Sequence, residues 1–234
     1  MKIIFFHIPK TAGTALVSGL HNALFDIKNP FRRYHFSVCP RASLSENWEQ
    51  TFSDRITIAK YGIRLKGVSL VTGHIPFFRI DEASENHEQW KSLTVFRDPV
   101  KRFISEYYYN KRKASSHLKI NTNLDDYLAS ESAILAGQTY LRWFSPEADL
   151  ELAKVNIQQI NIIGFQESLG ELNEKLIRDY NLRIRLKKIN KRPRKLEKEK
   201  DAEISDSQMN RIRELCKKDI KLYEYFSRNQ TNKV

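Results

Sequence analysis

Cysteine is scarce in this sequence: Cys39 and Cys216 are the only two among 234 residues, and they form no CxxC pair. Two cysteines without that spacing exclude a disulfide framework and a cysteine-rich metal site, leaving two buried thiols or one disulfide. The chain also lacks any apolar run near the ~18 residues that a membrane helix requires. It begins in a core-type strand without the apolar segment of a signal peptide. We therefore expect a cytoplasmic protein in a reducing setting.

Acidic residues are too few to balance the basic ones, since 28 Asp and Glu face 40 Lys and Arg and the net charge is +12. The excess is concentrated in residues 183–200, where ten Lys or Arg and two Glu account for +8 of that total. A solvated loop is the simple interpretation of such a run, and nucleic acid is the other obvious partner. The run lacks the interleaved aromatic residues typical of nucleic-acid modules, so we expect no nucleic-acid partner.

Short, continuous apolar runs recur along the chain, which is typical of strands buried on both faces of a parallel sheet. They are Ile3–Phe6, Val68–Thr72, Leu93–Phe96, Ile160–Phe165 and a further candidate at Ile184–Ile189. Helical patterns alternate with them at 14–26, 100–111, 168–180 and 205–227, the last capped by Ser205 or Asp206. This alternation predicts one α/β domain over residues 1–234, with a central, mostly parallel sheet flanked by helices. Residues 27–66 and 112–150 are longer, mixed segments that are predicted to be insertions, the second one helical and lying over one edge of the sheet.

The first apolar run leads into the turn Pro9–Thr14 and then into an amphipathic helix. A helix N-terminus offers N–H groups and the positive end of the helix dipole, and here Lys10 and two threonines accompany it. The order differs from the GxxxxGK[ST] nucleotide loop, because the lysine precedes Gly13 and no Lys-Ser/Thr pair is present to hold Mg²⁺. The turn predicts an anion site that works without a metal. A plain connection between strand and helix is the alternative.

A second apolar run ends at Arg97-Asp98-Pro99 and continues as a helix. Arg97 follows the strand at the carboxyl edge of the sheet, where open α/β sheets bind ligands. Pro99 suits the first helical turn, and Ser105 follows about two turns later. A forked guanidinium and a hydroxyl in this arrangement can reach one phosphate group. The alternative is that Arg97 only caps the turn.

One histidine stands where the run Val68–Thr72 ends. His74 should project over the same sheet edge as Lys10 and Arg97. An imidazole beside an anion site fits the removal of a proton from a hydroxyl group. His7 is the competing candidate, although its place before the lysine turn suits orientation of that turn. The remaining histidines have no such context and are interpreted as structural: His21, His35, His87 and His117.

Together, His7–Thr14 and Arg97–Tyr107 resemble the sulfotransferases that use 3′-phosphoadenosine-5′-phosphosulfate (PAPS), of the carbohydrate-type family that contains heparan sulfate 2-O-sulfotransferase. Ile162–Leu169 and Asp219–Tyr223 also resemble landmarks of that family, so the resemblance covers nearly the whole chain. It implies a P-loop-like fold, the 5′-phosphosulfate at the first segment, the 3′-phosphate at the second, and His74 as catalytic base. The donor-binding residues that it implies are Lys10, Thr11, Ala12, Gly13, Thr14, Ala15, Arg97 and Ser105, with Asn190, Arg192 and Arg194 from the basic segment.

The prediction is therefore transfer of a sulfuryl group from PAPS to an acceptor hydroxyl, most simply on a carbohydrate. Lys10 would stabilise charge on the transferred group and on the leaving phosphate, without a metal. The alternatives are an atypical P-loop phosphotransferase, a non-catalytic binder of polyanions or nucleic acids, and an inactive sulfotransferase relative. Residues 27–66 and 112–150 are predicted to form the acceptor side of the site. Basic residues in or next to these segments either suit an acidic sugar polymer or are solvated charges: Arg32, Arg33, Arg41, Lys111, Arg112 and Lys113.

Overall fold

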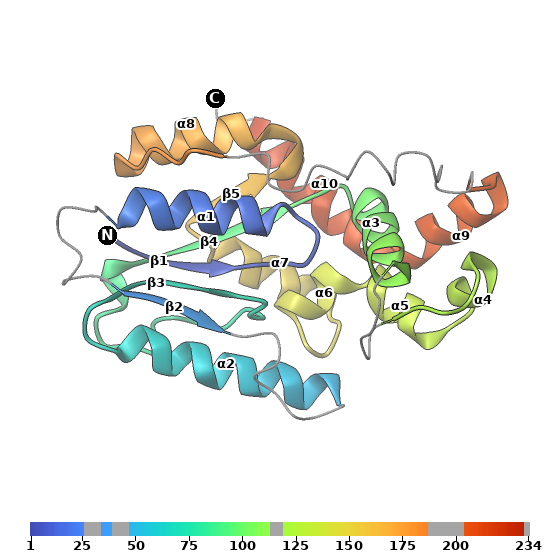
Figure 1. Cartoon of the computed structure of the whole chain (residues 1–234), viewed down its shortest axis with the longest axis horizontal. Helices are drawn as coiled ribbons and strands as arrows, with labels where there is room; N and C mark the ends of the chain where they lie inside the picture. Colours follow the sequence, from blue (N-terminus) through green and yellow to red (C-terminus); the bar gives the residue numbers. More distant parts are fainter. Residues whose placement is uncertain (26–33, 39–46, 113–118, 187–203, 232–234) are drawn as a thin grey trace.

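A parallel sheet of five strands forms the centre of the computed structural model, which describes residues 1–25, 34–38, 47–112, 119–186 and 204–231 (Figure 1). The strands are β1 (Lys2–Phe6), β2 (Tyr34–Val38), β3 (Val68–Gly73), β4 (Trp90–Phe96) and β5 (Ile162–Phe165). Their order is β2-β3-β1-β4-β5, and every neighbouring pair is parallel. This confirms the predicted fold class. Because β1 is central, its carboxyl end lies between those of β3 and β4.

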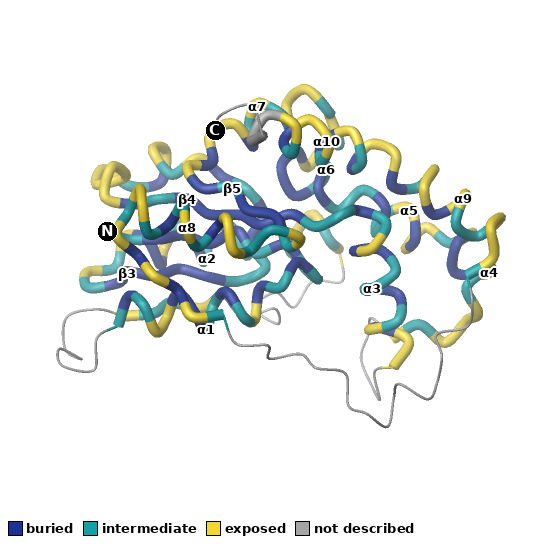
Figure 2. The backbone as a smooth tube through the Cα atoms, turned by 90° about the horizontal axis from the view of Figure 1, so that it is seen from above, coloured by how far each residue is buried: buried dark blue, intermediate teal, exposed yellow. Residues whose placement is uncertain are grey.

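Helices cover both faces of the sheet and complete the three layers (Figures 1 and 2). One face carries α1 (Gly13–Leu24) and α8 (Leu169–Tyr180); the other carries α2 (Trp48–Arg64), α6 (Thr139–Phe144), α7 (Leu150–Gln158) and α10 (Lys217–Thr231). Successive strand residues point to opposite faces, so Ile3 and Phe5 pack into one core and Ile4 and Phe6 into the other. All four side chains are fully buried, which fixes the register of β1.

A smaller helical lobe stands beyond the carboxyl ends of the strands, at the right of Figure 1. Its helices are α3 (Pro99–Lys111), α4 (Leu124–Leu128), α5 (Glu131–Gly137) and α9 (Asp206–Leu215). They enclose an apolar core that includes Phe103, Tyr107, Ile212 and the free thiol of Cys216. Cys39 lies outside the described residues. The predicted helical character of 112–150 is confirmed for its described part, and α4 and α5 lie beyond the strand ends rather than over an edge strand.

The structure differs from the sequence predictions at three points. The described part of 27–66 contains a strand that the apolar runs did not indicate, since β2 is an edge strand of the main sheet, and α2 covers one face. The described residues 184–186 form no strand, and 187–189 lie outside the described part. The predicted helix 205–227 is two helices that meet at Cys216, with Ser205 forming a capping box at the start of α9.

Two short 3-10 helices complete the described elements: η1 (His87–Gln89) and η2 (Gln166–Ser168). Within the described ranges, no helix combines the length and apolar character needed to cross a membrane.

Candidate active site

The turn after β1 has an unusual backbone. Lys10 and Ala12 adopt left-handed conformations, with φ of 69° and 66°. A residue with a Cβ pays about 1 kcal/mol or more for this conformation, so the surrounding contacts hold the turn. Ala12 is the N-cap of α1, and its carbonyl accepts hydrogen bonds from the N–H groups of Ala15 and Leu16. The Ala15 amide is therefore already used, whereas a helix provides no internal partner for the amides that precede it, those of Gly13 and Thr14.

Two residues of this turn, Thr11 and Gly13, are explained by contacts within the protein rather than with a ligand. The buried hydroxyl of Thr11 donates to the carbonyl of Ile8 at 2.8 Å, so its backbone amide is what remains for an anion. A Cβ added at Gly13 would overlap the imidazole of His7. The sequence analysis expected small residues here for close approach of a phosphate. In the structure a glycine is required at position 13 because the ring of His7 packs over the start of α1.

His7 and His74 lie side by side because of the strand register. Phe6 of β1 pairs with Gly73 of β3, so the residues that follow them meet above the sheet edge. Their ring centroids are 4.6 Å apart, and the N–H of His7 donates to the carbonyl of Gly73. Burial, and then the neighbouring His74, lower the pKa of His7 to about 3. His7 is therefore a neutral ring at physiological pH and a weak base.

Arg97 meets the Lys10 turn from the other side of β1. Its guanidinium Nη1 donates to the carbonyl oxygen of Lys10 at 3.2 Å. Its backbone N–H and carbonyl both bond the hydroxyl of Tyr140, and burial lowers the pKa of this half-buried arginine. The ammonium of Lys10 lies 3.8 Å from the ring centroid of Tyr109 on α3. The structure thus brings the two predicted anion-binding motifs together.

Helix α3 begins with Pro99 in its first turn, as the sequence predicts. Asp98 is its N-cap and accepts from the Lys101 N–H at 2.8 Å. Ser105 is partly buried and lies one turn before Tyr109, so it occupies the helix face that Lys10 touches. Arg102 has a structural role, because it is fully buried and bonds Glu106 and the carbonyl of Ala136. The predicted ligands Asn190, Arg192 and Arg194 lie outside the described residues.

A cleft of about 480 Å³ opens beside the histidine pair, between α1, β2 and the end of β3. Helix α1 presents one face to it, with residues at positions 14, 17, 18 and 21. The lining residues are His7, Thr14, Val17, Ser18, His21, His35, Ser37, Val38, Thr72, Gly73 and His74. The ring of His35 bonds the Thr72 hydroxyl at 2.8 Å and lies 5.6 Å from that of His21.

The sequence analysis treated His21 and His35 as structural, and the structure places both in the cleft wall. Thr14 and His21 are seven residues apart on one helix, a spacing that could have indicated a shared face. Burial, and then His21, lower the pKa of His35. Among the described residues, no group of three histidine, cysteine or acidic side chains could hold a metal ion.

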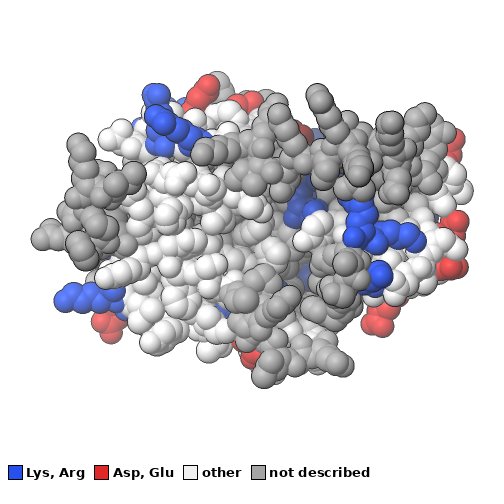
Figure 3. Space-filling view, in the orientation of Figure 1, with Lys and Arg blue, Asp and Glu red and all other residues white. Residues whose placement is uncertain are grey.

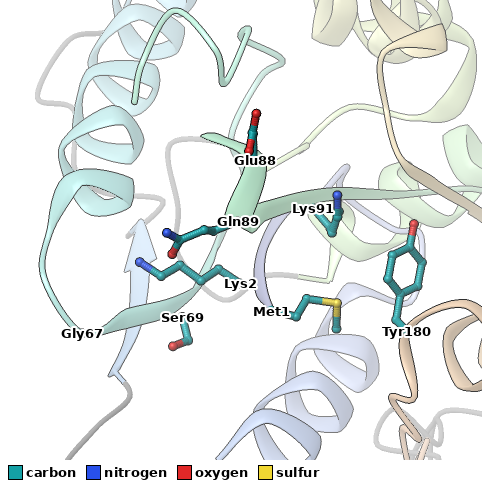
Figure 4. Close-up of a pocket in the computed structure, with 8 residues that line it drawn as sticks. All are labelled: Met1, Lys2, Gly67, Ser69, Glu88, Gln89, Lys91 and Tyr180. Carbon is teal, nitrogen blue, oxygen red and sulfur yellow. The ribbon is translucent and has the colours of Figure 1, made fainter. Parts of the chain in front are cut away.

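A second cavity, of about 510 Å³, lies at the opposite end of the sheet (Figure 4). Met1, Lys2 and Lys91 at the amino ends of β1 and β4 line it, with Tyr180 from the end of α8. None of the predicted site residues belongs to it. On the face drawn in Figure 3, Lys and Arg side chains lie over α3, toward the carboxyl ends of the strands, and another group lies over α8. The position of the predicted residues therefore favours the carboxyl edge as the functional site.

Comparison with protein families agrees with this arrangement. The model of a sulfotransferase family matches residues 1–226, from β1 into α10. No curated protein matches the sequence. The matched range contains the Lys10 turn, Arg97 and both histidines, and it confirms the predicted resemblance at the level of sulfotransferases. The chain belongs to the sulfotransferase family, whose members transfer a sulfuryl group.

Proposed function

We propose that this protein transfers a sulfuryl group from PAPS to a hydroxyl group of a carbohydrate. The observation that carries the proposal is the contact between Arg97 and the carbonyl of Lys10, which joins two anion-binding motifs at neighbouring strand ends. In this arrangement the 5′-phosphosulfate lies against the Lys10 turn and the first amides of α1. The 3′-phosphate lies at Arg97 and Ser105. One nucleotide then spans the carboxyl ends of β1 and β4.

Two imidazoles compete for the role of general base, and they differ in their surroundings. His7 is enclosed by Phe5, Gly13 and His74, and its pKa of about 3 makes it too weak a base near neutral pH. His7 and His74 both line the open cleft, so the lowered pKa of His7 is what disfavours it as the base. We therefore assign proton removal to His74 and orientation of the pair to His7.

In the reaction, His74 takes the proton of the acceptor hydroxyl as its oxygen attacks the sulfur of PAPS. The bond between sulfur and the 5′-phosphate oxygen breaks, and adenosine 3′,5′-bisphosphate leaves with the electron pair. Lys10 and the amides of Gly13 and Thr14 stabilise the charge that develops on the leaving oxygen. As in phosphoryl transfer, positioning and electrostatics then supply most of the rate.

The cleft beside His74 is the proposed acceptor site. Among its described lining residues, Ser18, Ser37, His21 and His35 offer hydroxyl and imidazole groups that hydrogen-bond a polyhydroxyl molecule. A sugar hydroxyl entering from this side reaches His74 while the nucleotide occupies the opposite side of β1.

Thermal unfolding in the presence of adenosine 3′,5′-bisphosphate, ATP with Mg²⁺, or heparin tests the proposal. At a hundred times its Kd, the bisphosphate should add about 2.7 kcal/mol and raise Tm by about 5–10 °C. Stabilisation by ATP with Mg²⁺ alone would indicate a phosphotransferase instead. Stabilisation by heparin without either nucleotide would indicate a polyanion-binding protein.

A further inference from the structure

The backbone of Arg97 is held by a side chain from a distant helix. Arg97 follows Phe96, the last ladder position of β4, which pairs with Phe165. The hydroxyl of Tyr140 accepts from the Arg97 N–H at 3.0 Å and donates to the Arg97 carbonyl at 2.6 Å. One hydroxyl thus bonds both polar backbone groups of the residue, in the place that a neighbouring strand would take.

Both the ring and the backbone of Tyr140 are held by contacts of their own. It is fully buried, and its ring meets that of Phe96 edge-on, with centroids 5.0 Å apart. The two carboxylate oxygens of the buried Asp219, on α10, accept from the backbone N–H groups of Tyr140 and Leu141 at 2.8 and 2.9 Å. Because α6 has no side-chain cap of its own, Asp219 supplies one from another helix.

The next peptide is held from the opposite side. The carboxylate of Glu167, in η2, accepts from the Asp98 N–H at 2.9 Å. The hydroxyl of Tyr223, on α10, donates to the same carboxylate at 3.3 Å. Asp219 and Tyr223 are one turn apart on one helix, so α10 supports the Arg97-Asp98 turn through two separate contacts.

We propose that Tyr140 is a positioning residue that aims the Arg97 guanidinium at the 3′-phosphate of the nucleotide, with Asp219 holding Tyr140 in place. The inference rests on the proposed function, because it needs a ligand that carries a 3′-phosphate. Without the hydroxyl, the Arg97 backbone loses two hydrogen bonds that restrain it. A forked donor loses its alignment with a small shift. The guanidinium would then remain charged, but its N–H groups would no longer be aligned with the 3′-phosphate.

The test compares two nucleotides, one with the 3′-phosphate and one without it. Calorimetry measures the affinity of wild type and Tyr140→Phe for adenosine 3′,5′-bisphosphate and for 5′-AMP, which lacks the 3′-phosphate. Phenylalanine preserves the buried ring and removes only the hydroxyl. We expect Tyr140→Phe to weaken bisphosphate binding about tenfold. Its affinity for 5′-AMP should stay within about twofold of wild type, because 5′-AMP lacks the phosphate that Arg97 would bind.

Tyr127→Phe is the matched control, since Tyr127 is also buried but packs on Phe103 and Tyr107 in the helical lobe. It should leave both affinities unchanged. Equal discrimination between the nucleotides by wild type and Tyr140→Phe would overturn the role of Tyr140, as would a parallel loss of both affinities. If wild type did not bind the bisphosphate more tightly than 5′-AMP, the proposed function would be overturned as well. Failure of the proposed function is therefore seen in wild type, and failure of the role of Tyr140 is seen only in the variant.

Amide hydrogen exchange of the wild type provides a second readout, should Tyr140→Phe fold poorly. The Arg97 N–H is bonded to a fully buried hydroxyl, so it should exchange slowly, at a rate comparable to the amides of β4. Exchange of the Arg97 amide at the rate of an exposed loop would overturn the inference.

Discussion

The guanidinium of Arg97 donates a hydrogen bond to the carbonyl oxygen of Lys10 across 3.2 Å, although 87 residues separate them in the chain. The contact follows from the strand order, which places β4 directly beside β1. It also links a left-handed turn to a guanidinium that retains other N–H groups for an anion. The two ends of the proposed nucleotide site are therefore physically coupled.

Two replacements of Arg97 should distinguish the contribution of its charge from that of its hydrogen-bond geometry to binding of the 3′-phosphate. Arg97→Ala should weaken binding of adenosine 3′,5′-bisphosphate by about 10–100-fold, the usual worth of a charge-assisted hydrogen-bond pair. Arg97→Lys should lie between wild type and Arg97→Ala, because it keeps the charge and loses the fork. Calorimetry gives the affinities. Arg79→Ala is the control, since Arg79 is exposed and paired with Asp81 and Glu82; an equal loss there would indicate nonspecific charge effects.

Gly13 should tolerate no side chain. In Gly13→Ala the new methyl group overlaps the His7 ring, so we expect a loss of about 1–3 kcal/mol in the free energy of unfolding and weaker nucleotide binding. Gly170→Ala, within α8, is the matched control, because a Cβ there meets nothing within 4 Å. That variant should be more stable by about 0.5–1 kcal/mol. Denaturant unfolding measures both, and equal stability of the two variants would contradict the packing of His7 on Gly13.

The depressed pKa of His7 predicts a particular pH dependence of stability. The pKa of His7 is about 3 in the folded protein and ordinarily 6.5. Between these pH values the unfolded chain is therefore protonated at His7 and the folded protein is not. Above pH 6.5 neither state is protonated at His7, and the free energy of unfolding is unaffected by this group. As the pH falls from 6.5 toward 3, protonation of the unfolded chain lowers the free energy of unfolding.

His7→Asn removes that titration. Relative to wild type, its free energy of unfolding should rise by on the order of 2–3 kcal/mol between pH 8 and pH 4. Urea unfolding at both pH values measures the difference. Parallel pH curves for the two proteins would show that His7 titrates normally in the folded state.

Local patterns in the sequence were sufficient to predict the strand ends that form the candidate site. Lys10, His74 and Arg97 each follow an apolar strand, and parallel strands present their ends at one edge. The contact between His7 and His74 needed the register of Phe6 with Gly73, which short apolar runs do not reveal. The role of Gly13 likewise depends on a ring that arrives from the preceding strand.

Other features depend on contacts distant in sequence. Strand β2 lies at the sheet edge and exposes Tyr34 and Ser37, so it lacks the continuous apolar run of a central strand. Because β2 was missed, the cleft between it and α1 could not be foreseen, nor could the place of His35. Tyr140 meets Arg97 only because α6 returns to the end of β4, and no local pattern marks that hydroxyl.

The measurement that most directly tests the account is release of adenosine 3′,5′-bisphosphate from PAPS in the presence of a panel of neutral and acidic oligosaccharides, with wild type and His74→Ala. The account predicts acceptor-dependent release by wild type and a rate at least about 100-fold lower for His74→Ala. Both proteins should bind the bisphosphate with affinities within about twofold, since His74 does not contact it in the proposed site. Release by His74→Ala at the wild-type rate, or no acceptor-dependent release by wild type, would contradict it.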